Sequence, residues 1–238
     1  MVAEPLQFAY THHSGSMMIN FRTLQAVIWD MDGVLIDSEG THQETWVIAL
    51  EKFGLPVYRE RLKRSFGMTS EMVVQMMVDD PLPEAIVSQI CSEKSRLFRN
   101  AIKANAVIIP GVKSWLDSFR NNGVLQAVAS SGTPENIEIA LGKLKIKEYF
   151  EVIVSGKNLP SKPEPFIFLK TAEMLSVNPL QCLVIEDSLA GVKAAKAAGM
   201  KCAAVATTYP VSELDLADIV VANLSHMMIE QIQELFQT

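Results

Sequence analysis

The feature that most constrains the fold is an alternation of short apolar runs with longer helical patterns. The apolar runs cover residues 24–29, 124–129, 182–185 and 202–205, and each has the length of a buried strand. Apolar side chains at helical spacing cover residues 112–121, 134–143, 165–175 and 189–198. Strands that alternate with helices in this way predict an α/β fold, a parallel sheet with helices on both faces. In such sheets, ligands bind at the carboxyl ends of the strands.

A long stretch without a convincing strand, residues 38–107, separates the first two apolar runs. It contains helical patterns at residues 38–53, 71–78 and 83–103 and is too long for a simple crossover. We expect it to form a helical cap, joined by linkers near residues 36–39 and 106–110 to a core made of residues 21–37 and 108–238. Residues 1–20 are expected to be an irregular or tag-like extension, because Thr11-His12-His13-Ser14-Gly15-Ser16 precedes Met17-Met18.

Composition narrows the classes of partner. The chain has 27 acidic and 21 basic residues, a net charge of -6, and no long run of either sign, so no basic stripe is expected for nucleic acid or an anionic membrane. No apolar run approaches the ~18 residues of a membrane span, and no secretory signal pattern is visible. We therefore expect a cytoplasmic protein, a monomer, whose partner is a small molecule. Three widely spaced cysteines predict buried thiols rather than disulfides or a zinc site.

The first apolar run ends in two carboxylates, in the sequence Asp30-Met31-Asp32-Gly33. Side chains at i and i+2 of an extended chain share a face, and the glycine lets the backbone turn sharply after them. One carboxylate could attack phosphorus while a magnesium ion neutralises charge, and the other could serve as acid and base. Taken alone the motif is weak evidence, because it also occurs in turns and calcium loops.

Three further polar motifs follow predicted strands. Ser130, Ser131 and Gly132 precede Thr133-Pro134, which suits a helix start, so the serine hydroxyl and nearby amides could cradle a phosphate. Lys162 lies between a serine and a proline and could steady the charge of a phosphate and a carboxylate. Glu186 and Asp187 follow the run at 182–185, where they could bind magnesium or simply favour the next helix.

These motifs, in this order, resemble the haloacid dehalogenase-like superfamily, and in particular its subgroup of β-phosphoglucomutase and sugar-phosphate phosphatases. The resemblance covers residues 24 to about 220 and implies a Rossmann-like core with an inserted helical cap. It implies that Asp30 is the nucleophile and Asp32 the acid and base, and that Ser130 and Lys162 bind phosphate. Magnesium would be held by Asp30, the main-chain carbonyl of Asp32, and Asp187, with Glu186 direct or water-mediated.

The resemblance also implies that cap residues recognise the substrate. It brings His42, Trp46 and Lys94 toward the site, and Gly67-Met68-Thr69-Ser70 matches the substrate-contacting cap loop. For His42, an ordinary place on the packed face of a helix is equally compatible with the sequence. Ser70 stands where the mutase carries an arginine, and serine cannot replace a bidentate phosphate contact.

The favoured function is thus hydrolysis of a small phosphomonoester, a sugar phosphate, with water as the acceptor. A mutase remains the alternative if Lys94 or Arg96 supplies the missing charge. A third possibility is a phosphate-binding module that keeps the fold without catalysis.

Overall fold

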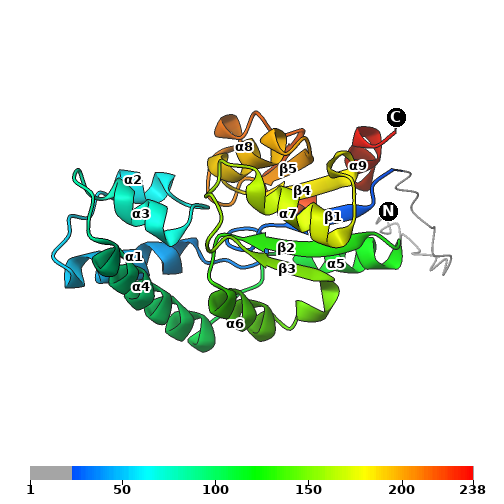
Figure 1. Cartoon of the computed structure of the whole chain (residues 1–238). Coiled ribbons are helices and arrows are strands. Elements are labelled where there is room, and N and C mark those ends of the chain that lie inside the picture. The colour runs from blue at the N-terminus through cyan, green and yellow to red at the C-terminus, as the bar shows by residue number, and fades with distance from the viewer. Residues whose placement is uncertain (1–22, 238) are drawn as a thin grey trace, which may run out of the picture.

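The predicted parallel sheet is present and has six strands. The computed structural model describes residues 23–237, so the extension predicted over residues 1–20 lies outside the described residues. The strands stand in the order β3-β2-β1-β4-β5-β6, and all neighbours run parallel (Figure 1). Their bounds are Ala26–Trp29 (β1), Leu125–Ser130 (β2), Val152–Ser155 (β3), Cys182–Glu186 (β4), Lys201–Val205 (β5) and Ile219–Val221 (β6).

The strand order places β1 at the point where the chain changes direction across the sheet. β1 pairs with β2 on one side and β4 on the other, with Ala26 opposite both Leu125 and Cys182. The loop after β1 therefore lies between the loops after β2 and β4. Ligands of open parallel sheets bind in the crevice at such a reversal. The α/β fold and its four predicted strands are confirmed, while β3 and β6 are additional.

Helices cover both faces of this sheet because each strand is apolar on both sides. In β1, Val27 and Trp29 belong to one buried cluster and Ala26 and Ile28 to the other. The first cluster packs against three helices, α5 (Val112–Asn121), α6 (Pro134–Leu144) and α9 (Ile229–Leu235). The second packs against α7 (Phe166–Leu175) and α8 (Leu189–Ala197). This is the arrangement that continuous apolar strands require.

Residues 38–107 contain only helices, and we call this segment the cap. The helices are α1 (Glu39–Lys52), α2 (Arg59–Arg64), α3 (Ser70–Met76) and α4 (Glu84–Ala104). They lie beyond the carboxyl ends of the strands, at the left of Figure 1. Residues such as Trp46, Leu50 and Ile90 form a hydrophobic cluster of their own there. The cap therefore has a core separate from the two clusters that flank the sheet.

The two ends of the cap run side by side. Asp37 N donates to Val107 O at 2.9 Å, and Ile109 N donates to Leu35 O at 3.1 Å. These two hydrogen-bonded segments, around residues 35–37 and 107–109, lie where the linkers are predicted. They connect the cap directly to the turn that follows β1.

Two predictions concern what the chain lacks. No helix within residues 23–237 combines the length and apolar character needed to cross a membrane. Cys182 and Cys202 are buried in β4 and β5, Cys91 is partly buried in α4, and all three are free thiols.

Candidate active site

Asp30 is the first residue after β1 and is held at the centre of the strand ends. Its amide donates to Ile185 O at 2.9 Å, and its side chain is buried. The chain then turns tightly, with Leu35 N and Ile36 N both donating to Met31 O. Gly33 in this turn has a φ of +79°, and a Cβ there would lie 1.9 Å from Asp187 Oδ2. Glycine is required both for the left-handed backbone and for the approach of that carboxylate.

Lys162 lies between two carboxylates that come from different strands. Its Nζ is 2.5 Å from Asp30 Oδ1 and 2.5 Å from Glu186 Oε1, and its side chain is buried. The resulting charge-assisted hydrogen bonds fix the lysine beside the Asp30 carboxylate. The structure thus brings Lys162 and Asp30 together, as the order of the motifs predicts.

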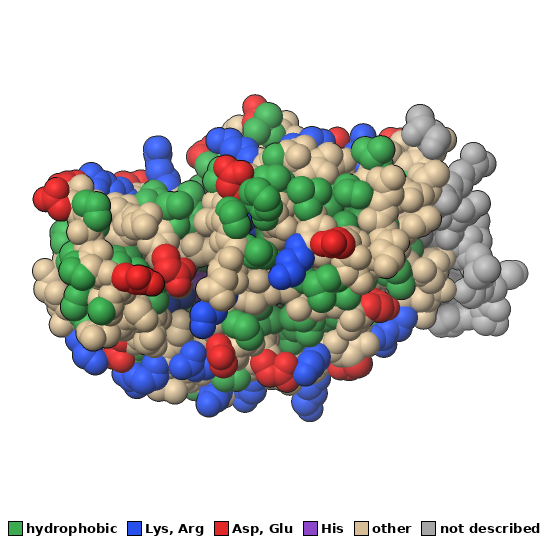
Figure 2. Space-filling model, in the orientation of Figure 1, with side chains coloured by type: hydrophobic (Ala, Val, Ile, Leu, Met, Phe, Trp, Pro, Cys, Tyr) green, Lys and Arg blue, Asp and Glu red, His purple; other side chains and the backbone are tan. Residues whose placement is uncertain are grey.

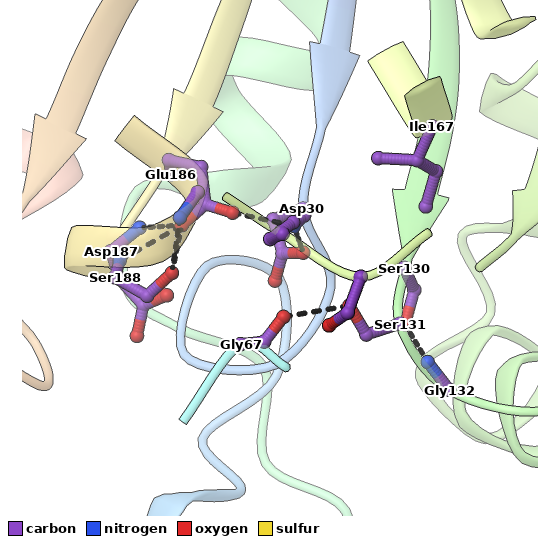
Figure 3. Close-up of polar contacts among 12 residues, drawn as sticks. Asp30, Gly67, Ser130, Ser131, Gly132, Ile167, Glu186, Asp187 and Ser188 are labelled. Atoms are coloured by element: carbon purple, nitrogen blue, oxygen red, sulfur yellow. Dashed lines mark hydrogen bonds and ion pairs between the residues drawn. The ribbon is translucent and has the colours of Figure 1, made fainter. Parts of the chain in front are cut away.

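Glu186 is anchored from the opposite side by the start of α8. Its Oε2 accepts from Asp187 N and Ser188 N at 2.8 Å and from Ser188 Oγ at 3.0 Å. Figure 3 shows these contacts converging on Glu186, with Asp30 across the site. Both oxygens of Glu186 are therefore engaged by protein groups. This geometry suits a residue that positions Lys162 better than a direct metal ligand.

Asp187 has one oxygen without a protein partner. Thr208 Oγ1 donates to Asp187 Oδ2, whereas Asp187 Oδ1 is buried and has no hydrogen-bond partner among residues 23–237. Thr208 follows β5, and the neighbouring Thr207 Oγ1 donates to Gly33 O at 2.5 Å. The loop after β5 therefore fixes both Asp187 and the turn after Asp30. A buried orphan carboxylate oxygen is the kind of group that a cation satisfies.

The charges at the strand ends do not balance. Asp30, Glu186 and Asp187 face one lysine, so the formal charge is -2 when all four groups are ionised. Burial, opposed by Lys162 and assisted by Glu186, raises the pKa of Asp30 to about 7. Burial, together with Glu186 and Asp30, raises the pKa of Asp187 well above its ordinary value. Burial alone would lower the pKa of Lys162, but Asp30 and Glu186 raise it above the ordinary value instead.

These residues fit a magnesium ion. No three His, Cys, Asp or Glu side chains within residues 23–237 converge as a preformed metal cluster. Magnesium needs only one or two protein carboxylates and keeps several waters. Asp30 and the orphan oxygen of Asp187 can supply those ligands, and a divalent cation would cancel the net charge of -2.

Asp32 faces the cap, where its carboxylate meets the start of α1 and where α4 backs His42. Asp32 Oδ1 accepts from Ser38 Oγ at 2.7 Å and lies 2.9 Å from His42 Nε2. Lys94 Nζ is 2.6 Å from His42 Nδ1. Because a protonated lysine has only donors, Nδ1 must accept, which leaves the ring proton on Nε2, the nitrogen that faces Asp32 without forming an aligned hydrogen bond. The cap thus supplies a chain of three groups that ends on the second aspartate.

The pKa shifts in this chain have opposing causes. Burial alone would raise the pKa of Asp32, but His42 and Ser38 outweigh it and hold the pKa below the ordinary value. Burial and Lys94 lower the pKa of His42, which keeps the ring neutral. Burial lowers the pKa of Lys94 to about 8 despite the attraction of Asp32. At neutral pH, Asp32 is therefore an ionised hydrogen-bond acceptor.

The serines after β2 form the expected turn into α6. Gly132 N donates to Ser130 Oγ at 3.1 Å, and Thr133 caps α6 by accepting from Asn136 N. Ser131 Oγ donates to Gly67 O of the cap at 2.7 Å, a contact drawn in Figure 3. Gly67 has a φ of +87°, and a Cβ there would lie 2.4 Å from Ser188 Oγ. The cap loop therefore touches the loops after both β2 and β4.

Two cavities lie between the cap and the core. The smaller has a volume of about 50 Å³ and is lined by Asp30 and Asp32 together with seven predicted substrate residues: His42, Trp46, Gly67, Ser70, Lys94, Ser131 and Gly132. The larger, about 690 Å³, is lined by Thr69 and by residues of α3, α4 and the core. Ser70 and Ser131 line both cavities. All eight predicted substrate residues thus line one cavity or the other.

Some residues at the site were missed by sequence reasoning, while one candidate lies elsewhere. Ser38, Thr208, Asn136 and Arg99 contact or line the site, and Arg99 Nη1 donates to Asn136 Oδ1 at 3.0 Å. Thr208 could have been found, because it follows a predicted strand as the other motifs do. Arg96 was one of the two cations expected to hold a second phosphate in the mutase alternative. It pairs instead with Glu93 at 2.8 Å and lines neither cavity.

Comparison with known proteins agrees with this geometry. Residues 27–205 match the haloacid dehalogenase-like hydrolase family. The chain is 33% identical over 184 residues to a phosphorylated carbohydrates phosphatase of Thermotoga maritima, covering 75% of this chain and 83% of that protein. It is 30% identical to a β-phosphoglucomutase of Bacillus subtilis, covering 89% and 95%.

A solved structure gives the same result for the whole fold. The crystal structure of β-phosphoglucomutase from Clostridium difficile superimposes with a TM-score of 0.81 at 27% identity, covering 90% of this chain and 97% of that one. The chain therefore belongs to the haloacid dehalogenase-like hydrolases, as the motifs predicted. Its relatives include phosphatases and a phosphomutase, in agreement with the expected class of enzyme.

Proposed function

We propose that this protein is a magnesium-dependent phosphatase that hydrolyses a sugar phosphate or similar small phosphomonoester through an aspartyl-phosphate on Asp30. The observation that carries the proposal is the setting of Asp30. Its carboxylate lies 2.5 Å from the buried Lys162, and it lines the same small cavity as Asp32. A nucleophile, a cation and a second carboxylate thus meet at the ends of the central strands.

In the first step, a carboxylate oxygen of Asp30 attacks phosphorus and the substrate alcohol leaves. Lys162 neutralises charge on Asp30 and on the phosphoryl oxygens, and Glu186 holds the lysine in place. Ser130 and the amides at the start of α6 offer hydrogen bonds to the phosphoryl group. Magnesium, held by Asp30, Asp187 and the carbonyl of Asp32, would supply positive charge to the phosphoryl oxygens.

Asp32 handles the proton in both steps. Its lowered pKa keeps it ionised at neutral pH, so its carboxylate is free to accept the proton of the water that hydrolyses the aspartyl-phosphate. To act first as an acid it must gain a proton, which the approach of an anionic phosphate favours by raising its pKa. Ser38 and His42 fix the direction in which its carboxylate points.

Ser70 in the cap loop favours hydrolysis over mutase chemistry. Ser70 lines both cavities, at the junction where an arginine could hold a second phosphate. Serine offers one neutral hydroxyl in place of a charged fork. The relatives include a phosphatase of phosphorylated carbohydrates, and that name supports the substrate class proposed.

The test is magnesium-dependent release of phosphate from para-nitrophenyl phosphate. We expect turnover by the wild type with Mg²⁺, none with a chelator, and none in Asp30→Asn, which preserves shape but removes the nucleophile. Wild-type turnover that survives in Asp30→Asn would contradict the assignment of the nucleophile. Absence of turnover on para-nitrophenyl phosphate and on sugar phosphates would favour a non-catalytic module.

A mutase is the second candidate, because Lys94 does line the small cavity. The discriminating measurement follows β-glucose 1-phosphate with glucose 1,6-bisphosphate as primer. A phosphatase releases inorganic phosphate, whereas a mutase accumulates glucose 6-phosphate. The monomeric state and the cytoplasmic location stay predictions, the first of which size-exclusion chromatography with light scattering would check.

A further inference from the structure

The two cavities between cap and core differ greatly in volume. The small cavity that contains Asp30 measures about 50 Å³, less than two water molecules at ~30 Å³ each. The larger cavity beside it, which we call the groove, measures about 690 Å³. This volume is within the ~300–1,000 Å³ range of small-molecule sites. With the cap in this position, the small cavity can take a phosphoryl group but not a carbon skeleton. The rest of the ester must extend into the groove.

The groove begins where a leaving group would emerge. Ser70 and Ser131 line both cavities and so mark the passage between them. Beyond them, one wall is a face of α4 with Ser88, Ser92, Ser95 and Arg99 at spacings of four, three and four residues. The opposite wall belongs to the core, with Glu135 at the start of α6 and the loop 157–159. Figure 2 shows side chains of both charges around the hollow between the cap and the core.

Hydroxyl groups dominate this lining. Seven of the sixteen lining residues are serine or threonine: Thr69, Ser70, Ser88, Ser92, Ser95, Ser131 and Thr133. Thr69 and Ser95 are more than nine-tenths buried as residues, and neither side-chain hydroxyl forms a hydrogen bond within residues 23–237, although neither oxygen is fully shielded from solvent. Thr69 stands at the N-cap position of α3 but does not cap it. Hydroxyls that line the groove without protein partners are free to bind a ligand that brings its own donors and acceptors.

The other lining residues exclude two classes of leaving group. None of the described residues that line the groove is aromatic, so there is no platform for stacking a base or ring. Glu71, Glu84 and Glu135 outnumber the two cations Arg99 and Lys157, which leaves a net charge of -1. A second phosphate would be repelled rather than held. Carboxylates and hydroxyls together suit the hydroxyl groups of a neutral sugar or polyol.

The volume also bears on the length of the leaving group. At ~30 Å³ per water the groove holds roughly twenty water volumes. A single hexose has about 12 non-hydrogen atoms, each smaller than a water molecule, so one ring would leave at least half of the groove filled with solvent. A second ring or an equally long polyol chain would occupy this space, which the hydroxyls of Ser92 and Ser95 line.

We propose that the groove is a leaving-group subsite for a neutral, polyhydroxylated phosphomonoester longer than one sugar ring. The proposal rests on the proposed function, since it takes Asp30 as the point to which the phosphoryl group is bound. It adds Ser92 and Ser95 to the expected Thr69 as residues that determine which ester is accepted. The face of α4, rather than the catalytic turn, then selects the substrate.

The test measures binding to full-length Asp30→Asn in Mg²⁺ by calorimetry, so that it does not depend on turnover. The ligands are glucose 6-phosphate, trehalose 6-phosphate, which adds a second neutral ring, and glucose 1,6-bisphosphate, which adds a second charge. We expect trehalose 6-phosphate to bind at least tenfold more tightly than glucose 6-phosphate. The bisphosphate should bind no more tightly than glucose 6-phosphate. Adding Ser95→Ala should weaken the binding of trehalose 6-phosphate about three- to tenfold and leave the binding of glucose 6-phosphate unchanged.

A matched pair of tryptophan substitutions tests the location. Ser92→Trp fills the groove and should remove the preference for trehalose 6-phosphate, whereas Asn100→Trp, exposed on the same helix and lining neither cavity, should keep it. Thermal unfolding of each variant checks that it is folded. Equal affinity for the two monophosphates, tightest binding of the bisphosphate, or an undiminished preference in Ser92→Trp would each overturn the subsite. Phosphate release by the wild type from para-nitrophenyl phosphate tests the proposed function separately.

Discussion

The core and the cap each bury a lysine near the site, and the two lysines are in opposite electrostatic states. Lys162 in the core touches two carboxylates at 2.5 Å, and these raise its pKa above the ordinary value although burial opposes them. Lys94 in the cap touches neutral His42, with its Nζ 4.8 Å from the ring of Phe98. Burial lowers its pKa to about 8. The core thus compensates its buried cation, and the cap does not.

This difference separates two tasks. At the strand ends the charged groups hold one another in place, so the machinery for phosphoryl transfer is preorganised by the fold. In the cap, the lysine and the hydroxyls of Thr69 and Ser95 are left with unmet interactions. Groups that are poorly satisfied without a ligand gain the most when one binds. The core therefore determines the reaction, and the cap determines which ester undergoes it.

The first way to break this comparison is Lys162→Met. Removing one partner of a buried ion pair leaves uncompensated charge, and we expect the free energy of unfolding to fall by about 3–5 kcal/mol at pH 8. The deficit should shrink at pH 5. There Asp30, whose pKa is already about 7 and rises further without the lysine, becomes protonated and neutral in the folded state. Urea unfolding at both pH values, with a chelator present, measures the change.

The control adds Glu186→Gln to Lys162→Met, which removes one of the two stranded carboxylates. This double variant should recover part of the lost stability. If Lys162→Met unfolds at the same urea concentration as the wild type at pH 8, then the charges at the strand ends are solvated, and the core is no better organised than the cap.

The sequence predicted most of the core because each element there has a local signature. Four strands and their helices follow from apolar runs and helical spacing. β3 and β6 were missed because they are short, with four and three residues, and stand at the two edges of the sheet. α2 was missed because its residues, Arg59–Arg64, are nearly all charged and show no apolar face.

The residues of the site also divide into those with a local sequence motif and those that depend on tertiary contacts. Asp30, Lys162 and Asp187 were predicted because they stand in ordered motifs at strand ends. Thr208 was not, although it follows a predicted strand, because its contact with Asp187 joins the loops after β4 and β5 and no motif along the chain indicates that pairing. The groove depends on how α4 faces the core, a tertiary relation that spacing along one helix cannot reveal. Ser95 therefore became a candidate only once its burial and its lack of a partner were known.

Lys94→Met should stabilise the protein, the opposite of the effect expected for Lys162→Met. A lysine whose pKa falls from 10.5 to about 8 on folding costs up to about 3 kcal/mol at pH 7. The unfolded chain keeps that proton up to pH 10.5, so the penalty declines between pH 8 and pH 10.5 as the folded lysine becomes neutral. The variant's advantage in urea unfolding should be greatest at pH 7 and vanish above pH 10.5. Turnover should fall, because His42 loses its neighbour.

The matched control is Lys103→Met, at an exposed position of the same helix. It should change stability by no more than ~0.5 kcal/mol at any pH in this range. Destabilisation by Lys94→Met at pH 7 would mean that the contacts with His42 and the aromatic rings compensate the lysine fully. The contrast with Lys162 would then disappear.

Ser70→Arg tests whether the cap alone selects the ligand. Its expected effect on binding is the smallest of the three. Arginine at the junction of the two cavities would add a charged fork where the groove now has a net charge of -1. In an Asp30→Asn background, we expect glucose 1,6-bisphosphate to bind about tenfold more tightly, corresponding to one charge-assisted hydrogen bond of ~1.5 kcal/mol. Calorimetry in Mg²⁺ gives the two dissociation constants.

Ser70→Gln is the control, because glutamine has similar reach and no charge. It should leave binding of the bisphosphate within about threefold of the parent, and glucose 6-phosphate should gain little from either substitution. An equal gain for both ligands would place the new arginine on the transferred phosphate instead of the distal one. If the protein with Asp30 and Ser70 intact already converts β-glucose 1-phosphate to glucose 6-phosphate while releasing little phosphate, Lys94 must serve as the clamp. The mutase assignment then replaces the phosphatase, because the charge that Ser70 lacks would come from the uncompensated lysine of the cap.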